Sequence, residues 1–368
     1  MVSELRSIQP MRTRIPSLIV AVLFAALTFS IQTSAQADTF GGGDPDEFTI
    51  DFVQISNTDN AEDNTGYGAV SYEYRVGKYE ISRLQITKAK ELGMIYVSSS
   101  GPSDNHPEAQ ITWYKAAWFV NWLNTSTGHQ AAYDLTYTNA SYSMKLWSSE
   151  QAWTAGGTNL YRNKDAFYFL PNENEWYKAA YYNPAGSNYF DYPTGSDTAP
   201  GALRGRGETG TPGGTGADTA VYGSPDDNKG DEATDTHLAS AYIYDAGGLS
   251  PYGTMAQGGN LWEWTESAYD RNNNSGSELR TLRGGGWSDV NATYLDASRR
   301  GDFDPNTAQD DLGFRVASVP EPSTAVLVLM AGGAWLLRKR LSRSLPADGS
   351  CLLAGAVTSL DTARAASA

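Results

Sequence analysis

The sequence predicts one irregular α+β domain with little regular secondary structure, and three observations support this prediction. Glycine and aromatic residues are abundant, with 37 Gly and 12% Phe, Trp and Tyr. Helical periodicity is confined to a few short segments, and residues 183–258 are dominated by Gly, Pro, Asp, Ser and Thr. Such a chain suits an α+β domain better than a helical bundle or a doubly wound sheet.

The first predicted elements are two strands and a helix. Residues 48–53 and 72–79 are rich in β-forming side chains, and a helix is expected over 84–92. A second helix is predicted over 113–124. Its apolar stripe follows helical spacing and consists of Trp113, Ala116, Ala117, Val120 and Leu123. Thr112 directly before it is a suitable N-cap.

A third helix is predicted to start at Asn172 and to run through Tyr182. Glu175 follows Asn172 at the spacing of a capping box. The next 76 residues, 183–258, lack clear apolar periods. We therefore expect irregular structure there, and the segment 201–235, rich in Pro, Gly and Asp, is a candidate for disorder.

Residues 1–37 have the pattern of a secretory signal peptide. A basic start with Arg6, Arg12 and Arg14 precedes an apolar stretch over 17–31, and Ala35-Gln36-Ala37 offers a small-x-small cleavage site. We expect cleavage to leave Asp38 as the mature N-terminus. The alternative is an uncleaved N-terminal anchor, but the apolar stretch is short for a membrane span.

The C-terminal region carries a second targeting pattern. Pro320-Glu321-Pro322 precedes the apolar run 325–337, which stops at Arg338-Lys339-Arg340. This order resembles the PEP-CTERM sorting signal of Gram-negative bacteria with an exopolysaccharide-rich envelope. The run is shorter than the roughly 20 residues that span a bilayer comfortably, and the basic triplet favours the cytoplasmic side. The alternative is a plain transmembrane anchor.

The resemblance implies an exosortase-type sorting enzyme as a partner, which would cut near the motif. It also implies export through the inner membrane to the envelope or the exterior. We assign 320–340 to the sorting and membrane segment. Residues 341–368 extend beyond the usual end of such tails and have no assigned role.

The remaining residues, 38–319, are long enough for a single large domain. A net charge of −15 argues against nucleic acid as a partner, because phosphates need Lys and Arg contacts. The charge suits solubility and cation binding outside the cell. Cys351 is the only cysteine, so the domain has no disulfide and must depend on packing.

Three motifs occur in a characteristic order within this domain. They are Gly-Gly-Asn-Leu-Trp-Glu-Trp-Thr at 258–265, Arg-Gly-Gly-Gly-Trp at 283–287 and Gly-Phe-Arg at 313–315. Together they resemble the formylglycine-generating enzyme (sulfatase-modifying factor) family over residues 74–317. The resemblance implies a C-type-lectin-like fold of low regular secondary structure. Copper-dependent members of the family oxidise substrates at a metal bound by cysteines.

The copper chemistry is not expected in this chain. The resemblance places the first copper cysteine at Asp289 and the second near Thr293 or Tyr294. Cu(I) needs soft thiolate ligands, which a carboxylate and a hydroxyl cannot replace.

Calcium is the cofactor that the resemblance does allow. Carried over, the carbonyls of Gly259 and Leu261 and the carboxylate of Glu263 would bind the ion. The remaining family ligand falls on Ala256, which offers only a main-chain oxygen. The alternative is that Glu263 pairs with a buried arginine, such as Arg283 or Arg315. A second calcium site would use Asp231 or Asp235.

Other catalytic centres lack support in the sequence. The family's iron-dependent sulfoxide synthases use histidines, but His106, His129 and His237 are widely spaced and share no helical face. A Gly-x-Ser-x-Gly hydrolase motif is also missing.

Three functions remain open at this point. The first is an exported protein that binds a peptide or a polysaccharide in the family's surface cleft, near Trp287, Asp289 and Asn291, with exposed aromatic rings as stacking platforms. The second is a divergent enzyme that uses Asp289 and Tyr294 as acid and base in the same cleft. The third is a structural protein of the extracellular matrix.

Overall fold

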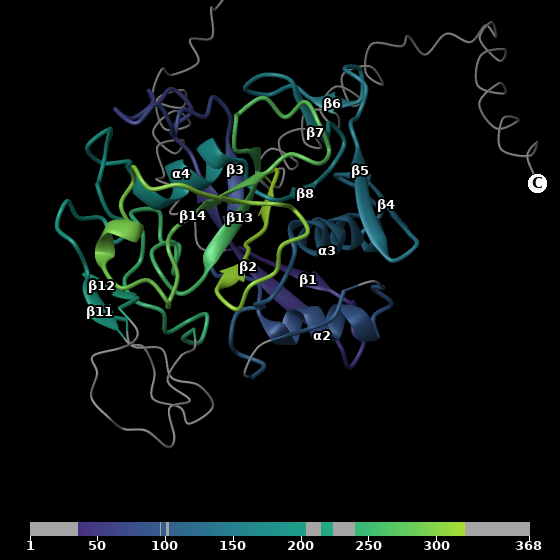
Figure 1. The fold of residues 1–368 in the computed structure, drawn as a ribbon, viewed down its shortest axis with the longest axis horizontal. Coiled ribbons are helices and arrows are strands. Elements are labelled where there is room, and N and C mark those ends of the chain that lie inside the picture. Colours follow the sequence, from purple (N-terminus) through teal and green to yellow (C-terminus); the bar gives the residue numbers. More distant parts are fainter. Residues whose placement is uncertain (1–35, 96, 101–102, 204–214, 224–239, 321–368) are drawn as a thin grey trace, which may run out of the picture. The chain divides into compact units, whose positions relative to one another are not determined.

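An antiparallel five-stranded sheet joins segments from both ends of the domain (Figure 1). The strands, in spatial order, are β1 (Gln36–Phe40), β2 (Phe48–Ile55), β3 (Tyr74–Gly77), β17 (Ala317–Ser318) and β8 (Tyr168–Phe169). The late strand β17 lies between β3 and β8, so that Ala317 pairs with both Val76 and Phe169. The sheet therefore pairs the end of the domain with its beginning.

The computed structural model describes residues 36–95, 97–100, 103–203, 215–223 and 240–320. The chain divides into two units, Met1–Pro320 and Glu321–Ala368, and all described residues belong to the first. The predicted tail from residue 321 onward and residues 1–35 of the predicted signal peptide lie outside them. Gln36 and Ala37, the last residues of that peptide, lie in β1 and pair with Phe52 and Asp51 of β2.

A second sheet of four strands carries the sequence motifs. Its spatial order is β15 (Gly301–Phe303), β14 (Arg280–Arg283), β13 (Trp262–Ala268) and β16 (Leu312–Gly313). β13 is antiparallel to β14 and parallel to β16.

The remaining strands form two-stranded sheets. These pairs are β4 (Asp134–Thr138) with β5 (Ser141–Lys145), β6 (Ala152–Trp153) with β7 (Asn159–Asn163), β9 (Tyr182–Asn183) with β10 (Asn188–Tyr189), and β11 (Gly201–Leu203) with β12 (Thr219–Val221). The stretch expected to be irregular thus contains short strands as well as loops.

The predicted helices are confirmed as α2 (Arg83–Glu91), α3 (Trp113–Ser126) and α4 (Glu173–Tyr181). A short 3-10 helix, η1, spans Ala292–Tyr294. Both predicted N-caps are also confirmed. Thr112 Oγ1 accepts the Lys115 N–H at 3.1 Å, and Asn172 and Glu175 form the reciprocal capping box. α4 ends one residue earlier than predicted because Tyr182 adopts an extended backbone and enters β9.

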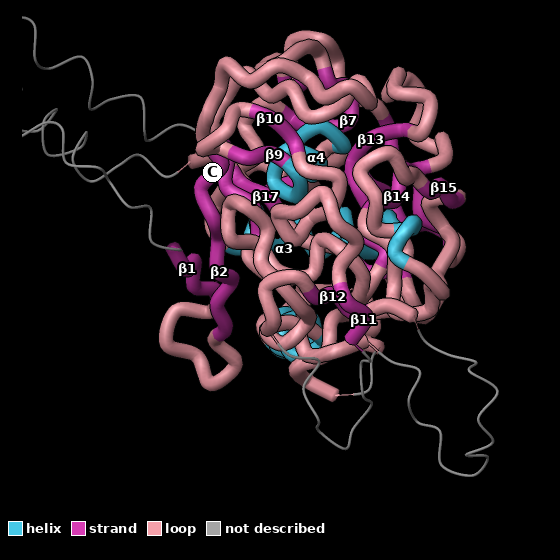
Figure 2. Tube along the Cα trace, turned by 90° about the vertical axis from the view of Figure 1, so that its left-hand side faces the viewer, coloured by secondary structure: helices cyan, strands magenta, loops and turns pink. Residues whose placement is uncertain are grey.

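The main core lies between β2, α2, α3 and the second sheet. Alternate side chains of β2, including Ile50 and Phe52, are buried against this core, as are Trp113, Phe119 and Trp264. Loops connect most of these elements, as Figure 2 shows by the large share of pink tube. The predicted low content of regular secondary structure is therefore confirmed, and large aromatic side chains fill the space between the short elements.

Buried ion pairs connect the elements that the loops separate. Arg162 on β7 is fully buried and donates to both oxygens of Glu175 on α4, each at 2.9 Å. It also donates to Glu266 on β13 at 2.9 and 2.8 Å. One guanidinium therefore links three elements, and burial raises the pKa of Glu266 above its ordinary value although Arg162 lowers it.

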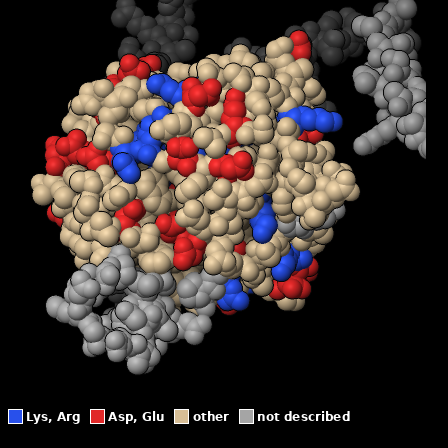
Figure 3. Space-filling model, viewed as in Figure 1, with Lys and Arg blue, Asp and Glu red and all other residues tan. Residues whose placement is uncertain are grey.

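Charged groups on the surface are arranged differently. On the face seen in Figure 3, acidic and basic residues are scattered over a largely uncharged surface. Among the described residues, no helix has the length and apolarity needed to cross a membrane.

We predict that Arg162→Met strongly destabilises the domain. The substitution would leave Glu175 and Glu266 buried without their shared cation, and breaking a buried pair typically costs about 3–5 kcal/mol. The free energy of unfolding, measured by urea denaturation, should fall by an amount in that range.

Arg83→Met is the matched control. Arg83 pairs with Asp104 at 3.2 Å on the surface, and exposed pairs contribute about 0–1 kcal/mol. If the two variants unfold at the same urea concentration as the unmodified protein, the buried cluster is not a major source of stability.

Candidate functional site

The three motif segments meet in the second sheet although up to 50 residues separate them. Glu263 in β13 lies opposite Arg283 in β14 and Gly313 in β16. The main chain of the first motif turns sharply before β13, with Gly259 at φ +80°. A Cβ at Gly259 would lie 2.2 Å from the carbonyl oxygen of Val221, so only glycine fits this close approach.

Glu263, the predicted calcium ligand, is engaged by a buried arginine. Arg315 donates to its two carboxylate oxygens at 2.6 and 2.5 Å, and the Trp176 indole donates at 2.7 Å. This is the alternative in which Glu263 pairs with Arg315. In this arrangement the predicted ligands do not fit a calcium ion, because both carboxylate oxygens of Glu263 accept hydrogen bonds from the Arg315 guanidinium. Calcium at Gly259, Leu261 and Glu263 stays a prediction that requires Arg315 to move.

A second buried carboxylate lies near this ion pair. Glu80 accepts the Leu261 N–H at 3.1 Å and a hydrogen bond from the Asn260 amide. Burial and then the charge of Glu263 raise the pKa of Glu80 well above its ordinary value. Asn260 and Leu261, the centre of the first motif, are thus held by Glu80, which gives the motif a structural role.

Asp289, at the predicted cysteine position, faces back toward its own loop. Its Oδ2 accepts the Gly286 N–H at 2.7 Å. Burial raises the pKa of Asp289 to about 6, although this hydrogen bond lowers it, and the nearby charge of Asp311 raises it further. Ser288 Oγ donates to Asp311 at 2.8 Å, so two carboxyl groups lie beside the Gly286–Asp289 turn.

The other predicted cleft residues do not form an aromatic platform. Trp287 is only 7% exposed and packs in a buried cluster with Val221, Met255 and Leu261, which corrects its expected role as an exposed stacking surface. Tyr294 is half-buried and its ring lies 4.7 Å from the Arg299 guanidinium carbon.

Asn291 is exposed but caps η1 by accepting the Thr293 N–H at 3.0 Å. Its side chain is therefore partly committed to local structure.

The histidines that the structure describes are far from a metal-binding arrangement. His106 is fully buried and bonds to Ser103 Oγ at 2.8 Å, while His129 stacks on Phe167 with ring centroids 4.7 Å apart. His237, Asp231 and Asp235 lie outside the described residues. Among the described ones, no three His, Cys, Asp or Glu side chains are grouped closely enough to hold a metal.

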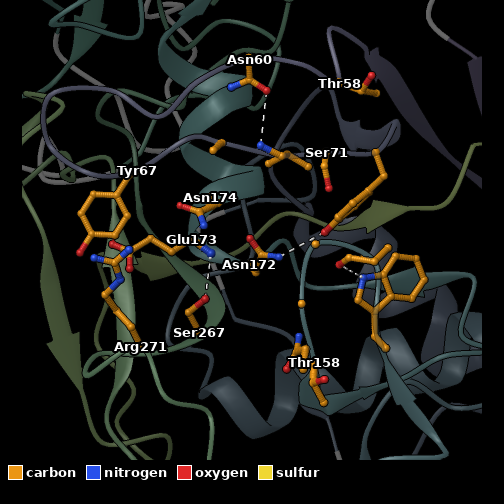
Figure 4. Close-up of a pocket in the computed structure, with 18 of the residues that line it drawn as sticks. Thr58, Asn60, Tyr67, Ser71, Thr158, Asn172, Glu173, Asn174, Ser267 and Arg271 are labelled. Carbon is orange, nitrogen blue, oxygen red and sulfur yellow. Dashed lines mark hydrogen bonds between the residues drawn. The ribbon is translucent and has the colours of Figure 1, made fainter.

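A polar pocket of about 560 Å³ was not predicted from the sequence (Figure 4). It is formed by five segments: 58–60, 67–72, 153–159, 172–174 and 267–273. Figure 4 shows Thr58 and Asn60 at one end, Thr158 at the opposite end, and Tyr67 with Arg271 on one side. The only signal in the sequence was the abundance of Asn, Ser and Thr in these loops, which does not identify a site.

The buried cluster around Arg162 lies directly behind this pocket. Tyr72 donates to Glu175 at 2.5 Å, and Asn159 donates to Glu266. Asn172 caps α4 and its backbone N–H donates to Glu175 at 2.6 Å. The side chains of Tyr72 and Asn159 and the backbone of Asn172 are therefore held in place by buried carboxylates.

We predict that Asp289 makes stability depend on pH. Its raised pKa means that the folded state binds more protons than the unfolded state between about pH 4 and 6, so stability should fall as pH rises through this window. Relative to Asp289→Asn, the free energy of unfolding of the unmodified protein should fall by on the order of 1 kcal/mol across this pH window. The change is small because solvent screens this half-buried group.

Urea unfolding at several pH values measures this difference. Asp311→Asn is the matched comparison. Removal of the Asp311 charge should lower the pKa of Asp289 in the folded protein, so that the loss of stability ends at a lower pH. A constant stability difference between the unmodified protein and Asp289→Asn from pH 4 to 7 would contradict the prediction.

Comparison with known proteins places this chain in a family. A model described as "Sulfatase-modifying factor enzyme 1-like domain" matches residues 43–319. Inactive C-alpha-formylglycine-generating enzyme 2 from Mus musculus is 36% identical over 95 residues, which make up 24% of this chain and 30% of that protein. The match thus spans about a third of the length of this curated relative.

Two solved structures resemble the fold. Treponema denticola variable protein 1 has a TM-score of 0.49 at 20% identity and covers 78% of this chain and 100% of that one. CarF has a TM-score of 0.47 at 17% identity and covers 74% and 99%, respectively. The family model covers most of the chain and agrees with the predicted α+β fold of the formylglycine-generating type. The chain therefore belongs to the sulfatase-modifying factor enzyme 1-like family.

Proposed function

We propose that this protein is an exported family member that lacks oxygenase activity and binds a peptide or polysaccharide ligand at the cell envelope. The observation that carries this proposal is the donor set at the position of the family's copper site. The family resemblance assigns Asp289 and either Thr293 or Tyr294 to that position, and the Asp289 carboxylate accepts the Gly286 N–H. None of these groups is a soft ligand, so the site does not fit Cu(I).

Two further observations support the loss of this chemistry. Cys351, the only cysteine, lies beyond the family domain at 43–319, so the domain cannot provide a thiolate. The curated relative from Mus musculus is itself described as inactive. A folded domain without its redox centre retains its surface, and ligand binding is the function that such a surface can still perform.

A divergent enzyme is the second candidate, favoured by one specific observation. The carboxyl groups of Asp289 and Asp311 lie near each other, and the pKa of Asp289 is raised to about 6. A carboxyl group that changes protonation near neutral pH can act as a general acid or base. Tyr294 on η1 would be the neighbouring proton carrier.

Export and processing form a separate part of the proposal. The signal peptide over 1–37 and the Pro-Glu-Pro motif at 320–322 support passage through the inner membrane and cutting by an exosortase-type enzyme. The protein would then reside in the Gram-negative envelope or outside the cell.

We predict that the purified full-length protein consumes no oxygen with a cysteine-containing peptide, with or without added copper. A family member that has both cysteines serves as the positive control in the same oxygen-electrode assay. Asp289→Cys/Tyr294→Cys should bind Cu(I) at least tenfold more tightly than the unmodified protein, because thiolates are its preferred ligands. Oxygen consumption by the unmodified protein above the peptide-only rate would refute the proposed loss of activity.

Replacing Pro320, Glu321 and Pro322 with alanine should block processing in a host that has an exosortase. The expected result is accumulation of the uncut form, seen on an immunoblot as a band of higher mass. Ser344→Ala, in the C-terminal extension, is the control and should be cut normally. Equal processing of both variants would show that the motif is not the recognition signal.

A further inference from the structure

The pocket of Figure 4 is rich in neutral polar side chains. Its lining includes five asparagines and four side-chain hydroxyls from Ser and Thr, together with the aromatic rings of Tyr67, Tyr72 and Trp153. Amide groups both donate and accept hydrogen bonds, and hydroxyls do the same. A ligand that matches the groups left free in this wall must therefore offer neutral hydrogen-bonding groups and a surface that can pack on aromatic rings.

Part of this polar wall is free to meet a ligand. Ser71 and Thr158 are exposed, and their hydroxyls make no hydrogen bond to any described residue. Asn174 uses its oxygen to accept the Gly68 N–H at 3.1 Å, which leaves its amide nitrogen available. Figure 4 shows Ser71, Asn172, Asn174 and Ser267 around the centre of the pocket.

The rest of the wall is rigid. The side chains of Tyr72 and Asn159 donate to the carboxylates of the buried Arg162 cluster, and the Asn172 side chain accepts the Glu175 backbone N–H at 2.9 Å. Asn273 donates to Asn159 at 3.0 Å and accepts the Ala268 N–H at 2.8 Å, so the amides support one another. Side chains that are already held in position lose little conformational entropy when a ligand binds.

An aromatic ring borders this polar surface. Trp153 is half-buried, and it contacts Phe169 and Tyr72 with ring centroids 5.8 and 5.6 Å apart. Its indole N–H donates to the Ala155 carbonyl at 3.0 Å. The ring is thus fixed at the pocket edge while part of its surface remains accessible.

Two of the charged lining residues, Glu173 and Arg271, are already paired or stacked. Glu173 accepts hydrogen bonds from Arg283 at 2.8 Å and from Arg300 at 2.7 and 2.9 Å. Arg271 lies over the Tyr67 ring at 4.6 Å and donates to the Gly66 carbonyl. With Asp59 also present, the lining offers no excess of positive charge for an anion.

We propose that this pocket binds a neutral oligosaccharide segment of about two or three sugar rings. Sugar hydroxyls match the free amide and hydroxyl groups, and the C–H face of a ring packs on Trp153 or Tyr72. A volume of about 560 Å³ lies within the usual range for ligand pockets. The inference rests on the proposed ligand-binding function and narrows its ligand to a neutral sugar at a defined site.

The test fills the pocket with large side chains and leaves the buried Arg162 cluster behind its wall unchanged. Ala69 and Ala155 are exposed lining residues, so Ala69→Trp and Ala155→Trp should fill the space and leave the fold intact. Ala185→Trp, at an exposed turn outside the lining, is the matched control. Melting temperatures of all three variants should stay within a few degrees of that of the unmodified full-length protein.

The probe is an array of neutral di- and trisaccharides, followed by calorimetry with the trisaccharide that gives the strongest signal. Each filling variant should weaken binding at least tenfold, whereas Ala185→Trp should bind normally. Ser71→Ala/Thr158→Val should weaken binding about tenfold, since each lost hydrogen bond contributes about 0.5–1.5 kcal/mol. A uronic acid trisaccharide should bind at least tenfold more weakly than the neutral one.

The outcomes separate this proposal from the proposed function. If no neutral sugar binds, or if the filling variants bind like the unmodified protein, the pocket assignment is wrong. Sugar binding that survives Ala69→Trp but is lost in Tyr294→Ala would overturn the pocket and keep the ligand-binding function. Tighter binding of the uronic acid trisaccharide would show that the ligand is not a neutral sugar. The loss of oxygenase activity is tested separately, by the oxygen-consumption assay.

Discussion

The arrangement of this domain depends on the buried guanidinium of Arg162, which joins β7 to α4 and β13 through Glu175 and Glu266. The domain has no disulfide and few long elements, so something other than covalent links must hold its loops. A buried cation between two carboxylates is strongly directional, and separating its partners would expose uncompensated charge to a low-dielectric interior. The short strands around it can therefore stay in register.

Similar pairs extend this principle through the second sheet. Glu173 on α4 binds Arg283 and Arg300, and Glu263 on β13 binds Arg315. These pairs give Glu263, Arg283 and Arg315, the charged residues of the three motifs, a role in holding the elements together.

The polar pocket differs from the cleft that the family resemblance predicts near Trp287, Asp289 and Asn291. In that predicted cleft, Trp287 is buried and the Asp289 carboxylate is hydrogen-bonded to its own loop. The pocket instead presents free hydroxyls above a rigid set of amides, supported by the Arg162 cluster. The same buried charges that stabilise the fold thus also hold part of the pocket wall in place. This would limit rearrangement in the ligand binding that we propose.

The sequence alone determined the local features of this protein. The caps at Thr112 and Asn172 could be predicted because they involve residues three positions apart. The lack of a cysteine in the domain likewise led from ligand chemistry alone to the expectation that copper does not bind. Only the tertiary structure decided that Glu263 pairs with Arg315, that Trp287 is buried, and that five distant segments form one pocket. These outcomes depend on contacts between segments that are not neighbours in the sequence, for which no short sequence pattern carries information.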